Sequence, residues 1–257
     1  MPSSCRLLLC RPLRALIPAL AAACATGAAA QTAPALAVTA GGSLQDASSA
    51  AIYTSPLATW EALARQGNAV AQYNLGVVYT TGQAVPQDER TAAQWFRKAA
   101  EQGHADAQYN LGIFYHAGRG VEQNFQEAAH WFRKAAEQGD SKAQFNVGVM
   151  HEDGQGVAQS YQEAAKWYRL AAEQGDTRAQ HNLGVLFDEG QGVEQDHEQA
   201  VHWFRRAAEQ GNIRAQVRLG VAYFKGQGVA QDIEQGKQWL EKAAAQNKAK
   251  AQTAPKK

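Results

Sequence analysis

Apolar residues recur along most of this chain with a helical spacing that restarts every 36 residues. Within residues 139–174, one buried helix face is indicated by the spacing i, i+4, i+7 and i+8 of Ala143, Val147, Met150 and His151. A second apolar stripe follows at Ala164, Trp167, Tyr168 and Ala171. Each unit is therefore predicted to be two helices, here over about residues 141–152 and 161–174.

The same unit recurs five times. Five tryptophans lie 36 residues apart, and an Ala-Gln pair returns with that period from Ala71 to Gln252. Each helix pair has a wide apolar face that it cannot bury alone, so the pairs must stack into an all-α solenoid. We expect a half repeat over 56–66, full repeats over 67–102, 103–138, 139–174, 175–210 and 211–246, a partial cap over 247–252, and a tail over 253–257.

Polar residues and glycines mark the predicted helix ends. Asp140 precedes the first helix of its unit and Ser160 the second, and both residue types accept hydrogen bonds from the free N–H groups of a helix start. Gly154 follows the first helix, where a left-handed backbone suits glycine. Asn247 stands where other units have glycine after the second helix, so we expect the last helix to end there.

A glycine also lies inside the first helix of every unit, at positions 76, 112, 148, 184 and 220. Such a glycine costs about 1 kcal/mol relative to alanine. The sequence therefore predicts a steric reason, namely the close approach of another helix backbone.

The first 30 residues differ from the rest in composition. They carry Arg6, Arg11 and Arg14, then an apolar run that ends in three alanines, and no acidic residue occurs before Asp46. This pattern predicts a secretory signal peptide cleaved after Ala30, followed by a flexible linker over residues 31–55. Without the signal the net charge changes from +1 to −2, which argues against nucleic-acid binding.

Two alternatives remain for this segment: a lipoprotein signal with an acylated Cys24, and a mitochondrial presequence. All three cysteines of the chain lie within residues 1–30. The predicted mature protein thus has no disulfide and no thiol nucleophile, and must be stabilised by packing.

The repeated residues A-Q-x-N-L-G-x-x-Y-x-x-G-x-G-V, followed by A-x-x-W-x-x-x-A-A-E-Q-G, resemble the Sel-one-like repeat family, relatives of the tetratricopeptide repeat. The resemblance covers residues 56–252. It implies a right-handed α/α superhelix whose first helices line the concave face, and an exported adaptor in bacteria. A cysteine-rich branch of the family is described as β-lactam-active, but this chain has no cysteine in any repeat.

The helix face opposite the core is the candidate partner-binding face. Its positions vary between units, whereas the core repeats, so a row of aromatic side chains there could form a peptide groove. The alternative is that these residues complete the packing between neighbouring first helices. The candidates are Tyr73, Tyr109, Phe145, His181, His116, Glu152, Asp188 and Phe224.

Three further rows allow two interpretations each. Glutamines such as Gln144 and asparagines such as Asn146 flank the first helices, and could form an inter-repeat hydrogen-bond ladder or contact a bound peptide. Arg97 and its equivalents precede a glutamate by four residues, which is typical of a solvated helix pair but would also suit an exposed basic row.

No motif points to catalysis or metal binding: histidines occupy unrelated positions, and H-E-x-x-H, Ser-x-x-Lys and G-x-S-x-G are absent. We therefore predict no enzyme activity, no cofactor and no metal. The leading hypothesis is a monomeric periplasmic or secreted scaffold, without a membrane span, that binds a peptide or protein on its concave face. The alternatives are a cell-wall or β-lactam hydrolase and an intracellular adaptor.

Overall fold

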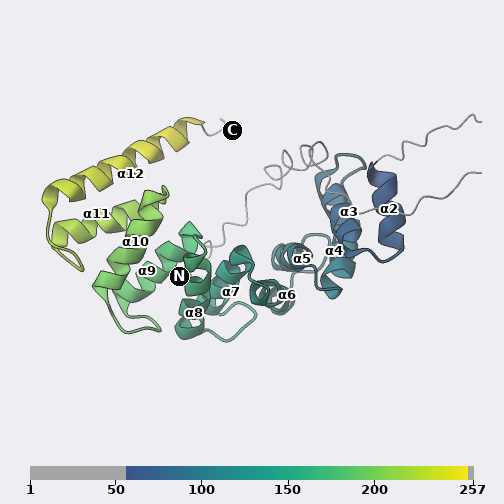
Figure 1. Ribbon diagram of the computed structural model, residues 1–257, viewed down its shortest axis with the longest axis horizontal. Coiled ribbons are helices and arrows are strands. Elements are labelled where there is room, and N and C mark those ends of the chain that lie inside the picture. The colour runs from purple at the N-terminus through teal and green to yellow at the C-terminus, as the bar shows by residue number, and fades with distance from the viewer. Residues whose placement is uncertain (1–55, 254–257) are drawn as a thin grey trace, which may run out of the picture.

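In the computed structural model, the described residues, 56–253, form eleven α-helices and no strand. Figure 1 shows these helices stacked side by side in an arc that runs from α2 to α12. The predicted right-handed α/α superhelical solenoid is confirmed, and each helix packs mainly on the helices before and after it. The predicted signal peptide 1–30, the linker 31–55 and residues 254–257 of the tail lie outside the described residues.

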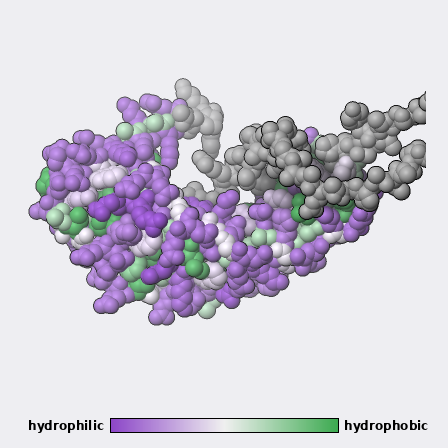
Figure 2. Space-filling view, viewed as in Figure 1, coloured by the Kyte–Doolittle hydropathy of each residue, from purple (hydrophilic) through white to green (hydrophobic). Residues whose placement is uncertain are grey.

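The helices alternate between a first helix, helix A, and a second helix, helix B, in each repeat. The A helices are α3 (Ala69–Thr81), α5 (Ala105–Ala117), α7 (Ser141–Asp153), α9 (Thr177–Glu189) and α11 (Ile213–Lys225). The B helices are α2 (Pro56–Arg65) of the half repeat, α4 (Glu89–Glu101), α6 (Phe125–Glu137), α8 (Tyr161–Glu173), α10 (His197–Glu209) and α12 (Ile233–Thr253). Figure 2 shows a mainly hydrophilic surface with separate apolar patches, because most large apolar side chains lie between the helices.

The predicted caps fix the helix starts. Asp140 Oδ1 accepts a hydrogen bond from the Ala143 N–H at 2.7 Å, and Ser160 Oγ accepts one from the Glu163 N–H at 3.2 Å. A cap therefore satisfies an N–H group that has no partner within the helix.

The end of the last helix was predicted wrongly. Helix α12 does not stop at Asn247 but continues to Thr253, and no non-glycine residue among those described has a positive φ. Asn carries a Cβ that disfavours the left-handed conformation, and the residues after it are good helix formers. No sixth helix pair follows in the described chain to favour a turn at this point.

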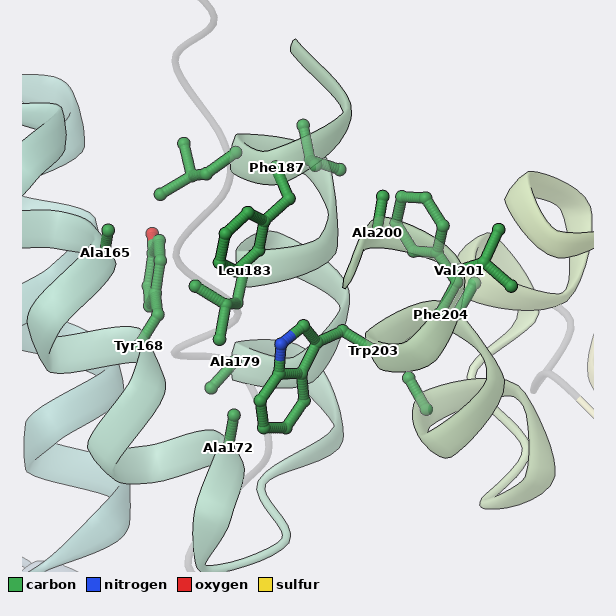
Figure 3. Close-up of a cluster of buried hydrophobic side chains, with 14 of the residues drawn as sticks. Ala165, Tyr168, Ala172, Ala179, Leu183, Phe187, Ala200, Val201, Trp203 and Phe204 are labelled. Carbon is green, nitrogen blue, oxygen red and sulfur yellow. The ribbon is translucent and has the colours of Figure 1, made fainter. Parts of the chain in front are cut away.

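The core runs continuously through the stack. Figure 3 shows Tyr168 of α8, Leu183 and Phe187 of α9, and Trp203 of α10 pointing into one shared cluster. One repeat alone would leave this cluster open, and stacking removes it from water.

The buried stripe of helix B is centred one residue later than predicted. The residue after each tryptophan is at most 2% exposed in repeats one to four: Phe96, Phe132, Tyr168 and Phe204. Trp131 and Trp203 are 7% exposed, but Trp167 is only half-buried. Tryptophan therefore lies on the flank of the stripe, where Trp167 packs against the core formed by α6 and α7.

The glycine inside helix A is explained mainly by a side chain of helix B. A Cβ on Gly148 would lie 2.6 Å from the Tyr168 ring, and a Cβ on Gly112 would lie 2.6 Å from the Phe132 ring. In repeats one to four the glycine thus makes room for the large aromatic residue of helix B in its own repeat. In repeat five a Cβ on Gly220 would lie 3.0 Å from the Gly236 carbonyl oxygen, so the predicted close approach of a helix backbone is found there.

The second loop glycine joins consecutive repeats. Gly156 has a φ of 71°, and a Cβ there would lie 2.2 Å from the Phe125 carbonyl oxygen of the preceding repeat. The loop after α7 therefore rests directly on the first turn of α6. This contact defines the spacing between repeats.

Glutamines form the predicted inter-repeat ladder. Gln144 Nε2 donates to the Ala136 carbonyl at 3.1 Å, and Gln144 Oε1 accepts from Gln174 Nε2 at 2.8 Å. The same pair of bonds recurs at Gln72, Gln108 and Gln180. The last rung is incomplete: Gln216 Oε1 is buried without a partner, because Gln246 lies inside α12 instead of at a helix end.

Candidate partner-binding face

The aromatic row of the candidate face lies partly inside the stack. Each side chain packs against the buried helix-B ring of its own repeat, with ring centroids 5.7–6.0 Å apart. These pairs are Tyr73–Phe96, Tyr109–Phe132, Phe145–Tyr168 and His181–Phe204. Phe145 is only 4% exposed, whereas the other three are half-buried. The row is therefore only partly accessible from outside.

Residues of the following repeats cover part of this row. The imidazole of His104 stacks on Tyr73 at 4.8 Å, and the Arg178 guanidinium lies 4.2 Å from the centre of the Phe145 ring. Burial raises the pKa of Tyr73 and of Tyr109 above that of an ordinary phenol, so both hydroxyls remain protonated at neutral pH. Asn110 and Asn146 of the next A helix lie close enough to these two tyrosines to influence their pKa, which supports the inter-repeat role of the asparagine row.

The remaining four candidates lie at the C-terminal ends of the A helices and are half-buried. His116 Nε2 lies 3.3 Å from Gln155 Oε1 of the next repeat, and burial lowers the pKa of this imidazole. Glu152 accepts a hydrogen bond from the Tyr168 hydroxyl at 2.5 Å. Asp188 lies 3.0 Å from His197 Nδ1 and 3.5 Å from Arg218 Nη1.

The burial of Tyr168 beside Glu152 raises the pKa of its hydroxyl well above the usual value. Phe224 is the fourth of these residues, and its ring lies close to Gly236 of α12. All four of these side chains therefore already make contacts within the protein itself.

The most exposed side chains of the A helices lie at other positions of the same face. Val70 is 57% exposed, and Asp106, Lys142 and Arg214 are exposed at the equivalent position of other repeats. Val217 and Val221 of α11 are 41% and 37% exposed, although the equivalent Phe145 and Val149 are buried. The two valines are exposed because no further A helix follows α11 in the described chain.

The arginine row is largely exposed, as expected of a solvated face, but its side chains reach the next repeat instead of pairing along their own helix. Arg97 donates to the Tyr115 hydroxyl and Arg205 donates to the Tyr223 hydroxyl, the latter at 3.1 Å. Arg133 lies 3.5 Å from His151 Nε2. The predicted pairing with the glutamate four residues later does not form at these arginines. Sequence spacing could not show that the next A helix lies within reach of the guanidinium group.

Neither a metal-binding constellation nor a membrane span is found within residues 56–253. Histidine, aspartate and glutamate do not gather there in groups of three suited to a metal ion. No helix in that range is long and apolar enough to cross a bilayer. The buried His151, 6% exposed, packs as a core residue, as its position in the apolar stripe suggests.

Comparison with known proteins matches the chain to one family. A family model described as Sel1 repeat matches residues 69–104, 105–140, 141–176, 177–212 and 213–248. The chain is similar to a solved protective antigen of uropathogenic Escherichia coli that displays an SLR fold, with 42% identity and a TM-score of 0.72 over 74% of this chain. The chain spans only 41% of that relative's length.

A Sel1 repeat protein from Oxalobacter formigenes is 40% identical, with a TM-score of 0.68 over 75% of this chain and 76% of its own. No protein in the curated set matches the chain. Sel1 repeats generally serve as non-catalytic scaffolds for protein interaction. The five matched repeats, the helix pairs and both solved relatives agree, and the chain belongs to the Sel1 repeat family.

Proposed function

We propose that this protein is an exported scaffold that binds a peptide or protein partner along the exposed face of its A helices. The supporting observation is a contrast between two adjacent positions of helix A. One is a buried alanine in every repeat, whereas its neighbour, at Val70, Asp106, Lys142, Arg178 and Arg214, changes between apolar, acidic and basic. The stack needs the alanine but does not need any particular neighbour. Four of the five neighbours are exposed and so available for recognition, whereas Arg178 is half-buried and pairs with Asp176.

The half-buried candidates would contribute shape to this face. Tyr73 and Tyr109 offer protonated hydroxyls and partly accessible rings, and amphipathic aromatic groups of this kind are common at interfaces. Exposed charged side chains around them would select the partner by electrostatic complementarity. The partner is expected to be a peptide or protein, because the predicted mature chain has little net charge to hold nucleic acid.

Site-specific photocrosslinking tests the binding face. A photoreactive amino acid placed at Asp106 or Lys142 points from the A helices, and one placed at Gln126 or Gln162 points from the B helices; all four positions are exposed. The proposal expects one protein to be crosslinked from the A-helix positions and not from the B-helix positions. Equal crosslinking from both sets, or from the B helices alone, would refute the assignment of the face.

Localisation is tested separately. Export with signal cleavage predicts that the purified native protein begins at Gln31 and is recovered from the periplasm or medium. A protein whose N-terminus is an acylated Cys24 would instead establish the lipoprotein alternative, and an uncleaved cytoplasmic chain would refute export.

A further inference from the structure

A cavity lies away from the A-helix face, between α4 and the loop that joins α5 to α6. Its volume is about 450 Å³, and Ala93 and Val121 contribute its apolar wall. Gly120 brings the loop onto the first turn of α4, since a Cβ there would lie 2.2 Å from the Glu89 carbonyl oxygen. The cavity is thus a consequence of the contact between repeats one and two.

Three cationic side chains line this cavity: Arg90, Arg97 and Lys98. Glu101 is the only carboxylate among its lining residues. Arg90 and Lys98 make no ion pair within the described chain. The cavity lining therefore carries three cations against one carboxylate, and the Asp88 carboxylate outside the lining lies close enough to interact with Arg90.

Two of the cations are held in place by aromatic groups. Lys98 Nζ lies 4.3 Å from the centre of the Trp95 ring, and Arg97 donates a hydrogen bond to the Tyr115 hydroxyl. A side chain that is already oriented loses less conformational entropy when it binds an anion. Lys98 and Arg97 are therefore already oriented, and Arg90 adds a third positive charge beside them.

The other repeats show which residue makes this junction different. Arginine and lysine recur at the positions of Arg97 and Lys98 in repeat two, as Arg133 and Lys134. The position of Arg90, by contrast, reads Arg90, Gln126, Gln162, Glu198 and Glu234 along the chain. All five residues are exposed, so the core does not dictate this change from positive through neutral to negative.

The junction of repeats four and five has a different cavity, of about 620 Å³, which shares with the first only the positions of Arg90 and Gly120. Its charged lining residues are Glu194, Asp196, His197 and Glu198, so a glutamate stands there in the place of Arg90. Arg205 and Arg206 recur at the positions of Arg97 and Lys98, so the change at the Arg90 position is what should make the fourth junction less attractive to an anionic ligand.

We propose that the cavity beside α4 binds an acidic peptide segment of a protein partner, and that Arg90 determines this specificity. Carboxylates fit the planar donor groups of two arginines, and the apolar wall can accept the methylene carbons of glutamate. The inference does not depend on the A-helix face, because the two surfaces use different helices.

Binding of a fluorescein-labelled hexaglutamate peptide, followed by anisotropy, tests the proposal on the native protein. Arg90→Gln reproduces the residue of repeat two and should weaken binding about five- to tenfold. Lys225→Gln removes an equal charge from an exposed site on α11 and should leave the affinity within about twofold. Gln126→Arg should create a second site, raising the stoichiometry from one peptide to two per chain.

Three results would overturn the proposal. The first is unchanged affinity in Arg90→Gln. The second is an equal loss in Lys225→Gln, which would show general electrostatic attraction. The third is inorganic phosphate, or a single-stranded oligonucleotide, binding at this cavity while hexaglutamate does not. Photocrosslinking from the A helices is read independently, so failure of one proposal is distinguishable from failure of the other.

Discussion

Replacing Gly148 with alanine should destabilise the protein, although alanine is the better helix former. Helix propensity alone would favour the alanine by about 1 kcal/mol. The new Cβ would lie 2.6 Å from the Tyr168 ring, however, and overpacking of this kind costs about 1–3 kcal/mol. The ring is fully buried and its hydroxyl is bonded to Glu152 at 2.5 Å, so it cannot move aside freely. We expect a net loss of about 1–2 kcal/mol.

Urea denaturation followed by far-UV circular dichroism measures this loss, with Tyr168→Leu as the second member of a double-mutant cycle. In the Tyr168→Leu background the ring is gone, so Gly148→Ala should cost less than in the unchanged chain; some cost should remain, because a Cβ on Gly220 would still lie 2.9 Å from Leu240 in repeat five. Gly112→Ala is a matched comparison, because Phe132 has a similar contact but no hydroxyl to anchor it, and its loss should be smaller. A higher urea midpoint for Gly148→Ala in the otherwise unchanged chain would refute the role of the ring.

Three further predictions concern packing, spacing and pH. Trp203→Ala should cost about 3–5 kcal/mol and Trp167→Ala less, because Trp203 is 7% exposed whereas Trp167 is half-buried; equal urea midpoints would contradict this. Gly156→Ala should lower the melting temperature far more than Gly139→Ala: both glycines have positive φ, but only the first Cβ would strike a carbonyl, at 2.2 Å. Burial lowers the pKa of His116, so the folded state prefers the neutral imidazole and stability should fall as the pH drops through 6.5; His116→Gln should flatten the melting-temperature profile there, and an unchanged slope would argue against it.

The period, the helix pairs and their caps were predictable because each depends on neighbours close in sequence. Helix ends depend on the local backbone, which Asp140, Ser160 and the loop glycines favour directly. The buried face of a helix follows from the spacing of its apolar residues. The glutamine ladder was also predictable, because a polar residue that recurs on the flank of every A helix lies between that helix and its neighbours in a stack.

The contacts between repeats were decided by the tertiary structure. Arg97 reaches the Tyr115 hydroxyl instead of Glu101, and the aromatic candidates pack on buried rings, because both depend on distances between helices that no single helix pattern contains. The end of the last helix likewise could not be predicted from the repeat pattern alone. Gln246 matches the repeat by sequence and Asn247 stands at its glycine position, but no further helix pair packs there in the described residues, so α12 continues and Gln216 keeps an unpaired oxygen. Periodicity determined the repeated unit, and the burial created by neighbouring units determined which of its side chains remain available for binding.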